Sequence, residues 1–283
     1  MKNTHLLLTL GLAASASSLF ADFSYPNFTD TTGLQLNGNA ASTGGVLRLT
    51  PADFWQAGSA FSTNTVSLSS TASFSTFFQF QIHDDGGISD EDGQGADGIV
   101  FTLQTVSNTV GSSGNGIGYY GIPNSLGVEF DTYNNGSGYD PNGNHVNFDY
   151  NGAFSPDTNA VEIPERMNDD GIWSAWVDYN GATQDLELRL VEGSTVRPAA
   201  PILQANVDLA TVLGSTNAFV GFTAATGAAY DDHDILNWQF RQDFNPITNP
   251  TGGGAVPEPS TYGLLGAAAL LGVVGLRRRI RRA

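Results

Sequence analysis

The chain contains no cysteine among its 283 residues, so no disulfide bond can stabilise it. A domain of this size must then depend on its hydrophobic core. Basic residues are scarce as well, because Lys2 and five C-terminal arginines leave only five in residues 22–255, against 27 acidic residues. The resulting net charge of −22 argues against nucleic acid or an anionic membrane as a partner, and it favours the binding of cations.

Long apolar runs are missing from the central region and occur only at the two ends. Residues 1–21 contain one lysine, then an apolar run, then small residues that end in alanine. This is the pattern of a secretory signal peptide, and the run is too short for a membrane-spanning helix. We therefore expect export of the protein, with cleavage after Ala21.

The C-terminal segment also has the composition of a sorting signal. It opens with Val256–Pro259, continues with 15 uncharged apolar residues, Tyr262–Leu276, and ends in a cluster of five arginines. Fifteen residues are few for a membrane-spanning helix, which needs about 20, and the arginines would stay on the cytoplasmic side. The segment closely resembles the PEP-CTERM sorting tail of Gram-negative bacteria. A plain C-terminal membrane anchor is the alternative interpretation.

The resemblance to a sorting tail implies a route of export. An exosortase would recognise the tail while the apolar helix holds the protein transiently in the inner membrane. Removal of the tail would then release the protein or leave it at the cell surface or in the extracellular matrix. The chain is thus predicted to divide into a signal peptide (1–21), one central domain (22–243), a linker (244–255) and a sorting signal (256–283).

The central domain is predicted to consist of β-strands. The segment Ser73–Ile82 alternates apolar and polar side chains, with Phe74, Phe78 and Phe80 on one face, and Gln184–Leu190 repeats the pattern. Many such segments, separated by turns rich in Gly, Asn, Asp and Ser, predict an all-β fold, an antiparallel β-sandwich. The other predicted strands are Val46–Thr50, Gly98–Gln104, Leu126–Asp131, His145–Tyr150, Trp173–Tyr179, Ala218–Ala224 and Ile235–Arg241.

One short segment, VEFDTYNNGSGYDPNGNH at residues 128–145, is unusually dense in polar groups. On a strand, residues i and i+2 point to the same side, so Glu129 and Asp131 present two carboxylates on one face. The loop that follows can fold back and bring Asp140 and His145 to the same point. Three interpretations compete: a metal site, a pair of catalytic carboxylates and an ordinary polar turn.

The residue types of this segment favour a metal site. The polar turn fits poorly, because the apolar Val128 and Phe130 interleave with the acids. One histidine with several carboxylates suits a transition ion such as Mn²⁺, whereas carboxylates, an amide oxygen and a backbone carbonyl suit Ca²⁺. Three clustered carboxylates would repel one another strongly without a cation.

The segment resembles the metal-binding motif of the L-type (legume-type) lectins, in which Glu, Asp, an aromatic residue, Asn, Asp and His follow one another at increments of 2, 2, 2, 5 and 5. The resemblance implies a concanavalin A-like jelly roll and one ion each of Ca²⁺ and Mn²⁺. It assigns the following residues: Glu129, Asp131, Asp140 and His145 to Mn²⁺; Asp131, the Tyr133 carbonyl, Asn135 and Asp140 to Ca²⁺; and Ser155 to a Mn²⁺-bound water.

The resemblance extends from about Phe23 to Phe240 and implies a sugar site above the metals. Asp97 would follow a cis peptide bond and accept hydrogen bonds from two sugar hydroxyls. The backbone N–H of Gly118 would reach the sugar, since only glycine allows so close an approach. Asn135 would bind both Ca²⁺ and sugar, and the Tyr133 ring would offer an apolar platform.

The resulting expectation is a secreted Ca²⁺/Mn²⁺-dependent carbohydrate-binding protein, not an enzyme, whose partner is a glycan or exopolysaccharide. Two alternatives remain: a structural or adhesion protein of the matrix that keeps the fold without tight sugar binding, and a glycoside hydrolase. A hydrolase of this fold would need a second catalytic carboxylate near Glu129 and Asp131, where this sequence has Tyr133 and Asn134. A homodimer is possible by resemblance, and the acidic loop 83–95 is either solvated or a further ion site.

Overall fold

In the computed structural model, the chain is described at residues 22–68, 70–111, 116–154 and 159–250. Nearly all of its regular structure is β-strand. The predicted signal peptide, the sorting tail and Ser155 lie outside the described residues. The strands are β1 Phe23–Tyr25, β2 Leu34–Gly38, β3 Ala41–Thr43, β4 Val46–Thr50, β5 Ala57–Ser62, β6 Val66–Ser67, β7 Phe74–Gly87, β8 Gly98–Gln104, β9 Ser125–Asp131, β10 His145–Tyr150, β11 Val161–Glu162, β12 Ile172–Asn180, β13 Asp185–Glu192, β14 Leu203–Asn206, β15 Asn217–Ala225 and β16 Ala229–Arg241.

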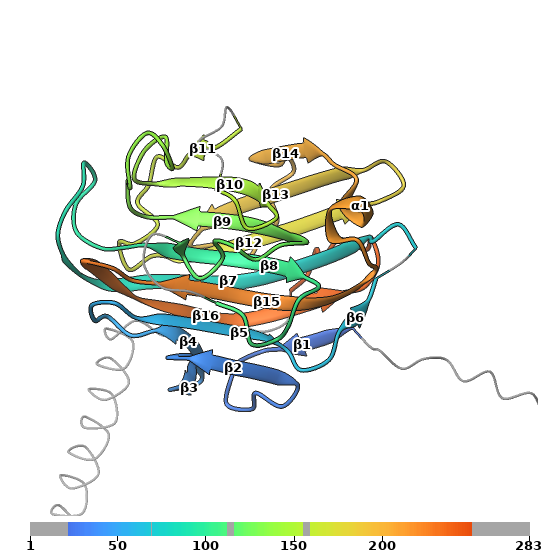
Figure 1. Ribbon diagram of the computed structural model, residues 1–283, viewed down its shortest axis with the longest axis horizontal. Coiled ribbons are helices and arrows are strands. Elements are labelled where there is room, and N and C mark those ends of the chain that lie inside the picture. Colours follow the sequence, from blue (N-terminus) through green and yellow to red (C-terminus); the bar gives the residue numbers. More distant parts are fainter. Residues whose placement is uncertain (1–21, 69, 112–115, 155–158, 251–283) are drawn as a thin grey trace, which may run out of the picture.

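Two sheets face each other across a common core (Figure 1). One sheet has the order β14-β13-β12-β7-β16-β4-β3, with β1 paired to β16, and we call it the back sheet. The other has the order β11-β10-β9-β8-β15-β5-β2, with β6 paired to β15, and we call it the front sheet. Every strand pair is antiparallel, so the predicted all-β antiparallel sandwich is confirmed.

The predicted strand bounds agree with the structure to different degrees. The predicted segments Val46–Thr50, Gly98–Gln104 and His145–Tyr150 coincide with β4, β8 and β10, whereas β16 begins at Ala229, six residues before its predicted start at Ile235. The helix described is α1, Leu209–Leu213, with Asp208 capping its first turn through Thr211 N–H. Among the described residues, no helix is long and apolar enough to cross a membrane.

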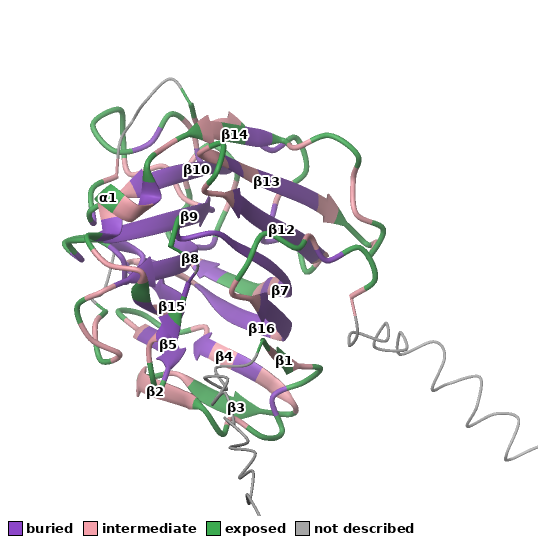
Figure 2. Ribbon diagram, turned by 90° about the vertical axis from the view of Figure 1, so that its right-hand side faces the viewer, coloured by how far each residue is buried: buried purple, intermediate pink, exposed green. Residues whose placement is uncertain are grey.

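Aromatic side chains from both sheets fill the space between them. Phe78 on β7 contacts Phe101, Phe130 and Phe222 from three strands of the front sheet, with ring centroids 5.0–5.7 Å apart. These rings are fully buried, and Figure 2 shows burial concentrated on the central strands of each sheet. Such rings each bury a large apolar area, so a core of this kind can stabilise a domain that has no disulfide bond.

The outer face of the back sheet is also covered in one place. Phe77 points away from the main core and packs against Trp176, with ring centroids 4.9 Å apart. Ile247, only 1% exposed, completes this second cluster. Asn245 N–H donates to Ser75 Oγ at 3.0 Å and helps to hold the chain there. The first residues of the stretch predicted as a linker therefore lie against the sheet.

Candidate functional site

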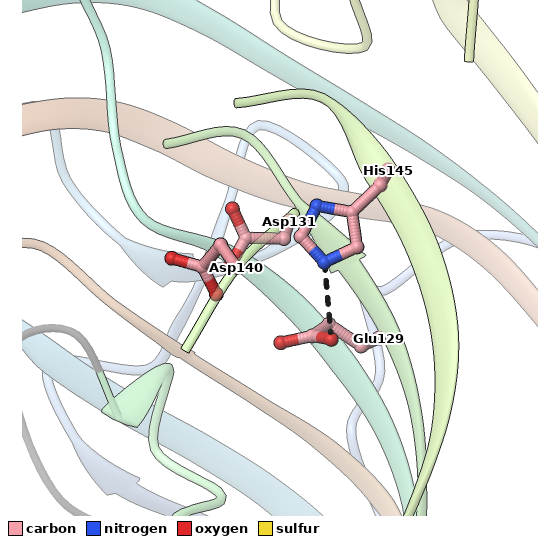
Figure 3. A group of neighbouring side chains, drawn as sticks. All are labelled: Glu129, Asp131, Asp140 and His145. Carbon is pink, nitrogen blue, oxygen red and sulfur yellow. Dashed lines mark ion pairs between the residues drawn. The ribbon is translucent and has the colours of Figure 1, made fainter. Parts of the chain in front are cut away.

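The pairing of β9 with β10 determines which polar side chains meet. Asp131, the last residue of β9, lies directly opposite His145, the first residue of β10. Glu129 lies two residues before Asp131 and therefore points to the same side of the sheet. Figure 3 shows the carboxylates of Glu129 and Asp131 converging with the His145 ring.

The loop between β9 and β10 folds back over this end of the front sheet. Asp131 Oδ1 accepts the backbone N–H of Tyr133 at 2.8 Å, which starts the turn. Asp140 Oδ2 accepts the N–H of Asn135 at 2.6 Å, and Asp140 N–H donates to the Gly136 carbonyl at 3.0 Å. These bonds close the loop on itself and aim the Asp140 carboxylate at the β9 acids.

The result is a compact group of four buried side chains. Glu129, Asp131, Asp140 and His145 each offer one ligand atom, and these four atoms lie within 4.8 Å of one another. His145 Nε2 is 3.5 Å from Glu129 Oε2, while Glu129 Oε1 is buried without a hydrogen-bond partner. In the described part of the chain, the arginine ion pairs involve other carboxylates. Oxygen donors with one imidazole fit a divalent cation.

Burial shifts the pKa values of all four side chains toward their uncharged forms. Burial, followed by Asp140, raises the pKa of Glu129 to about 8. Burial and the charges of Glu129 and Asp140 raise the pKa of Asp131 well above its ordinary value. Burial also raises the pKa of Asp140 and lowers that of His145. A bound cation would favour the ionised carboxylates and the neutral imidazole together.

Asp97 lies beside this group, just before β8. Its N–H donates to the Ala225 carbonyl at 3.0 Å, and its own carbonyl accepts Thr132 N–H at 3.2 Å. The Ala96–Asp97 peptide bond is cis, as the lectin resemblance implied. The side chain is 3% exposed and its Oδ2 has no hydrogen-bond partner. Burial raises the pKa of Asp97 to about 7, opposed by an interaction with the Asn135 side chain.

Gly118 reaches the same edge of the front sheet through β15. It has φ +70, and a side-chain carbon on it would lie 2.7 Å from Thr223 Cβ. Thr223 Oγ1 donates to the Ile117 carbonyl at 2.7 Å and holds the segment there. Only glycine can occupy this close approach. Asp97 bonds to Ala225, which lies two residues beyond Thr223 on β15. Both predicted sugar-binding residues, Asp97 and Gly118, are therefore held against the same strand.

The part of the predicted acidic loop 83–95 that follows β7, residues 88–95, contributes to no group of candidate metal ligands among the described residues. It supports the β9–β10 loop instead. Asp90 Oδ2 accepts Asn134 N–H at 2.7 Å, and Glu91 Oε1 accepts the Asn134 side-chain amide at 2.7 Å and Gly143 N–H at 3.1 Å. These two side chains therefore clamp the loop that carries Asp140.

The first two residues of that predicted loop, His83 and Asp84, lie on β7 of the back sheet and form a second group of ligand types with Asp232. Arg48 forms ion pairs with Asp232 and with Asp234 in the same place. The negative charge there already has a cation beside it. This group is therefore much less suited to an added metal ion than the group at β9 and β10.

Two buried residues at the start of β16 were not among the predicted site residues. His233 Nε2 accepts Gly98 N–H at 3.2 Å, so its Nδ1–H is free to donate to Thr50 Oγ1 at 2.6 Å. Asp231 is fully buried, and Asn168 donates to its Oδ2 at 3.3 Å. Both side chains support the backbone next to Asp97. No motif in the sequence distinguishes them from ordinary strand residues.

With this geometry in place, comparison with known families identifies the class of protein. The family profile "Legume lectin domain" matches residues 20–252. The chain therefore belongs to the legume lectin family, whose members are carbohydrate-binding proteins and not enzymes. The "PEP-CTERM protein-sorting motif" matches residues 255–279, which supports export through a sorting system of Gram-negative bacteria and implies processing by an exosortase.

Plant proteins are among the curated relatives. "L-type lectin-domain containing receptor kinase VII.1" of Arabidopsis thaliana is 29% identical over 272 residues, which cover 88% of this chain. "L-type lectin-domain containing receptor kinase SIT2" of Oryza sativa is 31% identical over 84% of this chain. This chain spans only 38% of the length of either relative.

Solved structures of legume lectins have the same fold. Lectin I-B4 from Griffonia simplicifolia, in a metal-free form, is 26% identical with a TM-score of 0.66 over 78% of this chain and 98% of that one. Basic winged bean lectin with Tn-antigen is 28% identical with a TM-score of 0.64, over 78% and 97%. Legume lectins depend on metal ions, and this chain has a candidate acidic cluster for them. The predicted family and the prediction of a non-enzyme are confirmed.

Asp231 is expected to make stability depend on pH. Burial raises its pKa to about 9, whereas an unfolded aspartate releases its proton near pH 3.9. The folded state therefore holds more protons between these values, and the free energy of unfolding falls as the pH rises through this window. Urea unfolding measures the free energy of unfolding at each pH. Between pH 5 and pH 9 the fall in this free energy should be smaller by about 2 kcal/mol or more in Asp231→Asn than in the wild-type protein.

The exposed Asp243 provides the control for this measurement. Asp243→Asn should keep the slope of the wild-type protein, because this side chain is exposed at the surface. An Asp231→Asn variant with the wild-type slope would show that Asp231 ionises freely in the folded protein.

Proposed function

We propose that this legume lectin domain is an exported, Ca²⁺- and Mn²⁺-dependent carbohydrate-binding protein. The observation that carries the proposal is the buried group of Glu129, Asp131, Asp140 and His145 directly beside Asp97. Its partner would be an extracellular or surface polysaccharide.

The donor atoms support two neighbouring ions. Glu129, Asp131, Asp140 and His145 would hold Mn²⁺, and Asp131, the Tyr133 carbonyl, Asn135 and Asp140 would hold Ca²⁺. When bound, the ions supply positive charge that balances the buried carboxylates. The shared ligand Asp131 ends β9, and the shared ligand Asp140 lies within the loop, where it already accepts Asn135 N–H. Ionised ligands would therefore keep this loop closed and Asn135 in a fixed position.

The sugar would bind above this loop. Asp97 would accept hydrogen bonds from two sugar hydroxyls through its unpartnered Oδ2 and its other oxygen. Gly118 N–H and the Asn135 amide would donate to the same sugar, and the Tyr133 ring would cover one of its apolar faces. A few directed polar groups beside an aromatic surface are typical of small-ligand sites.

Chelation tests the dependence on metals. A ligand present at about a thousand times its dissociation constant stabilises the folded protein by about 4 kcal/mol. Treatment with EDTA should therefore lower the melting temperature and abolish binding on a glycan array, and Ca²⁺ with Mn²⁺ should restore both. If glycan binding survived chelation unchanged, a metal-dependent site would be excluded.

Asp97 tests the sugar site itself. Hydrogen bonds to a charged group contribute about 1.5–3 kcal/mol each, so Asp97→Asn should weaken binding of any glycan that scores on the array by at least about tenfold. The melting temperature should hardly fall, because the side chain keeps its shape. As the control, Asp243→Asn should bind glycans as the wild type does. If Asp97→Asn bound with wild-type affinity, Asp97 would not be part of the sugar site.

Asp90 tests the clamp on the β9–β10 loop. Asp90→Ala leaves Asn134 N–H without its acceptor. Loss of a residue that orients metal ligands weakens metal affinity by about 10- to 100-fold, which calorimetric titration of Ca²⁺ into the demetallated protein measures. The matched control is Asp92→Ala, an exposed acid of the same loop. Equal effects of the two variants would mean that only the loop's net charge matters.

A further inference from the structure

Trp55 is an exposed tryptophan beside the candidate sugar site. It lies in the segment that connects β4 of the back sheet to β5 of the front sheet, and its side chain is 68% exposed. The three other tryptophans of the chain, Trp173, Trp176 and Trp238, are each at most 3% exposed. Tryptophan is enriched among the residues that contribute most to binding at interfaces.

The backbone holds Trp55 in an unfavourable conformation. Its φ of 60° lies in the left-handed region, which a bulky residue rarely adopts. Such strain persists only where neighbouring contacts impose it, and it concentrates at functional sites. Two sets of contacts hold Trp55 in this conformation. Trp55 N–H donates to the Gly227 carbonyl at 3.2 Å, and Thr226 bonds to Asp53 and Gln56 on the two sides of the segment.

Thr226 fixes the segment around Trp55 to the turn between β15 and β16. Its buried hydroxyl accepts Gln56 N–H at 2.8 Å and donates to the Asp53 carbonyl at 2.7 Å. Its own N–H donates to the Gln56 carbonyl at 2.9 Å. Phe54 adds an apolar anchor, since its ring meets that of Tyr230 edge-on at 4.7 Å. The exposed indole is therefore displayed from a rigid support.

The indole and the Asp97 carboxylate face the same point in space. A side-chain carbon on Gly227 would lie 3.5 Å from Asp97 Oδ2 and 3.9 Å from Trp55 Cζ3. The two groups differ in depth, because Asp97 is 3% exposed and Trp55 is 68% exposed. Asp97 thus forms the floor of the site, and Trp55 stands at its rim.

We propose that Trp55 forms a second sugar subsite, where its indole stacks on the sugar unit next to the one that Asp97 holds. This inference rests on the proposed carbohydrate binding and makes it more specific: the preferred partner is an oligosaccharide or polysaccharide, not a free monosaccharide. A glycan that leaves the buried floor must pass the rim, where the indole offers an apolar surface to the C–H face of a sugar ring. Tyr133, by contrast, belongs to the metal loop.

The test compares affinities for sugars of different length. The full-length chain with Ca²⁺ and Mn²⁺ is applied to an array that carries galactose, N-acetylgalactosamine, glucose and mannose, each alone and as the terminal unit of di- to tetrasaccharides. Trp55→Gly removes the indole and suits φ 60°, so the fold should remain intact. Trp55→Phe keeps a ring. Phe244→Ala removes another exposed aromatic side chain, which lies beyond the C-terminal end of β16.

We expect Trp55→Gly to bind oligosaccharides about tenfold more weakly than the wild type does, because one stacking contact is lost. It should bind the matching monosaccharides equally well. Trp55→Phe should lose less, and Phe244→Ala should match the wild type. Because Trp55 is the one exposed tryptophan, a bound tetrasaccharide should also protect the protein's fluorescence from quenching by iodide, whereas the monosaccharide should protect it little.

The other outcomes overturn the inference in distinguishable ways. Unchanged oligosaccharide affinity in Trp55→Gly would exclude the subsite while leaving the proposed lectin function in place. Equal losses for monosaccharides and oligosaccharides would assign Trp55 to the Asp97 site itself. If the wild type bound no sugar on the array, the proposed function would fail, and the subsite with it.

Discussion

The burial of three neighbouring carboxylates is the constraint on which the proposed functional end of this protein depends. Glu129, Asp131 and Asp140 converge almost without access to water. Burial raises the pKa of all three carboxyls, and neighbouring negative charges raise the pKa values of Glu129 and Asp131 further. Most of a protein avoids such an arrangement. Buried carboxylates are compatible with a folded domain if they stay protonated or if cations balance their charge. Balance by cations would link folding to the binding of metal ions.

Hydrogen bonds connect the surroundings of these acids to distant segments at the same end of the front sheet. The β9–β10 loop closes over the acids, and Asp90 and Glu91 hold it from the β7–β8 connection. Asp97 is held in turn between Ala225 and Thr132. Through Thr226, the β15–β16 turn then fixes the segment that displays Trp55. The candidate metal site, the closed loop and the proposed sugar-binding groups are thus parts of one hydrogen-bonded structure.

The strands were predictable to different degrees for physical reasons. β8 and β10 lie inside a sheet with clear apolar sequences, and their bounds match the predictions. The short edge strands β3 and β11 and the helix α1 bury too few residues to leave a pattern. The outward-facing Phe77 breaks the expected polar face of β7, since Trp176 and Ile247 cover it from segments far along the chain. The pattern of neighbouring residues cannot predict that distant segments pack on the outer face of a strand.

The sequence by itself determined the all-β class, the legume lectin family and the concentration of acids within residues 128–145, because alternation and residue spacing are properties of neighbouring residues. The tertiary structure decided which distant groups join that site. Asp231 and His233 lie beside the backbone next to Asp97, and Trp55 is its exposed neighbour. These contacts join residues up to about 180 positions apart in the sequence. Such contacts arise only when the two sheets pack, since that packing determines which loops meet at the same edge.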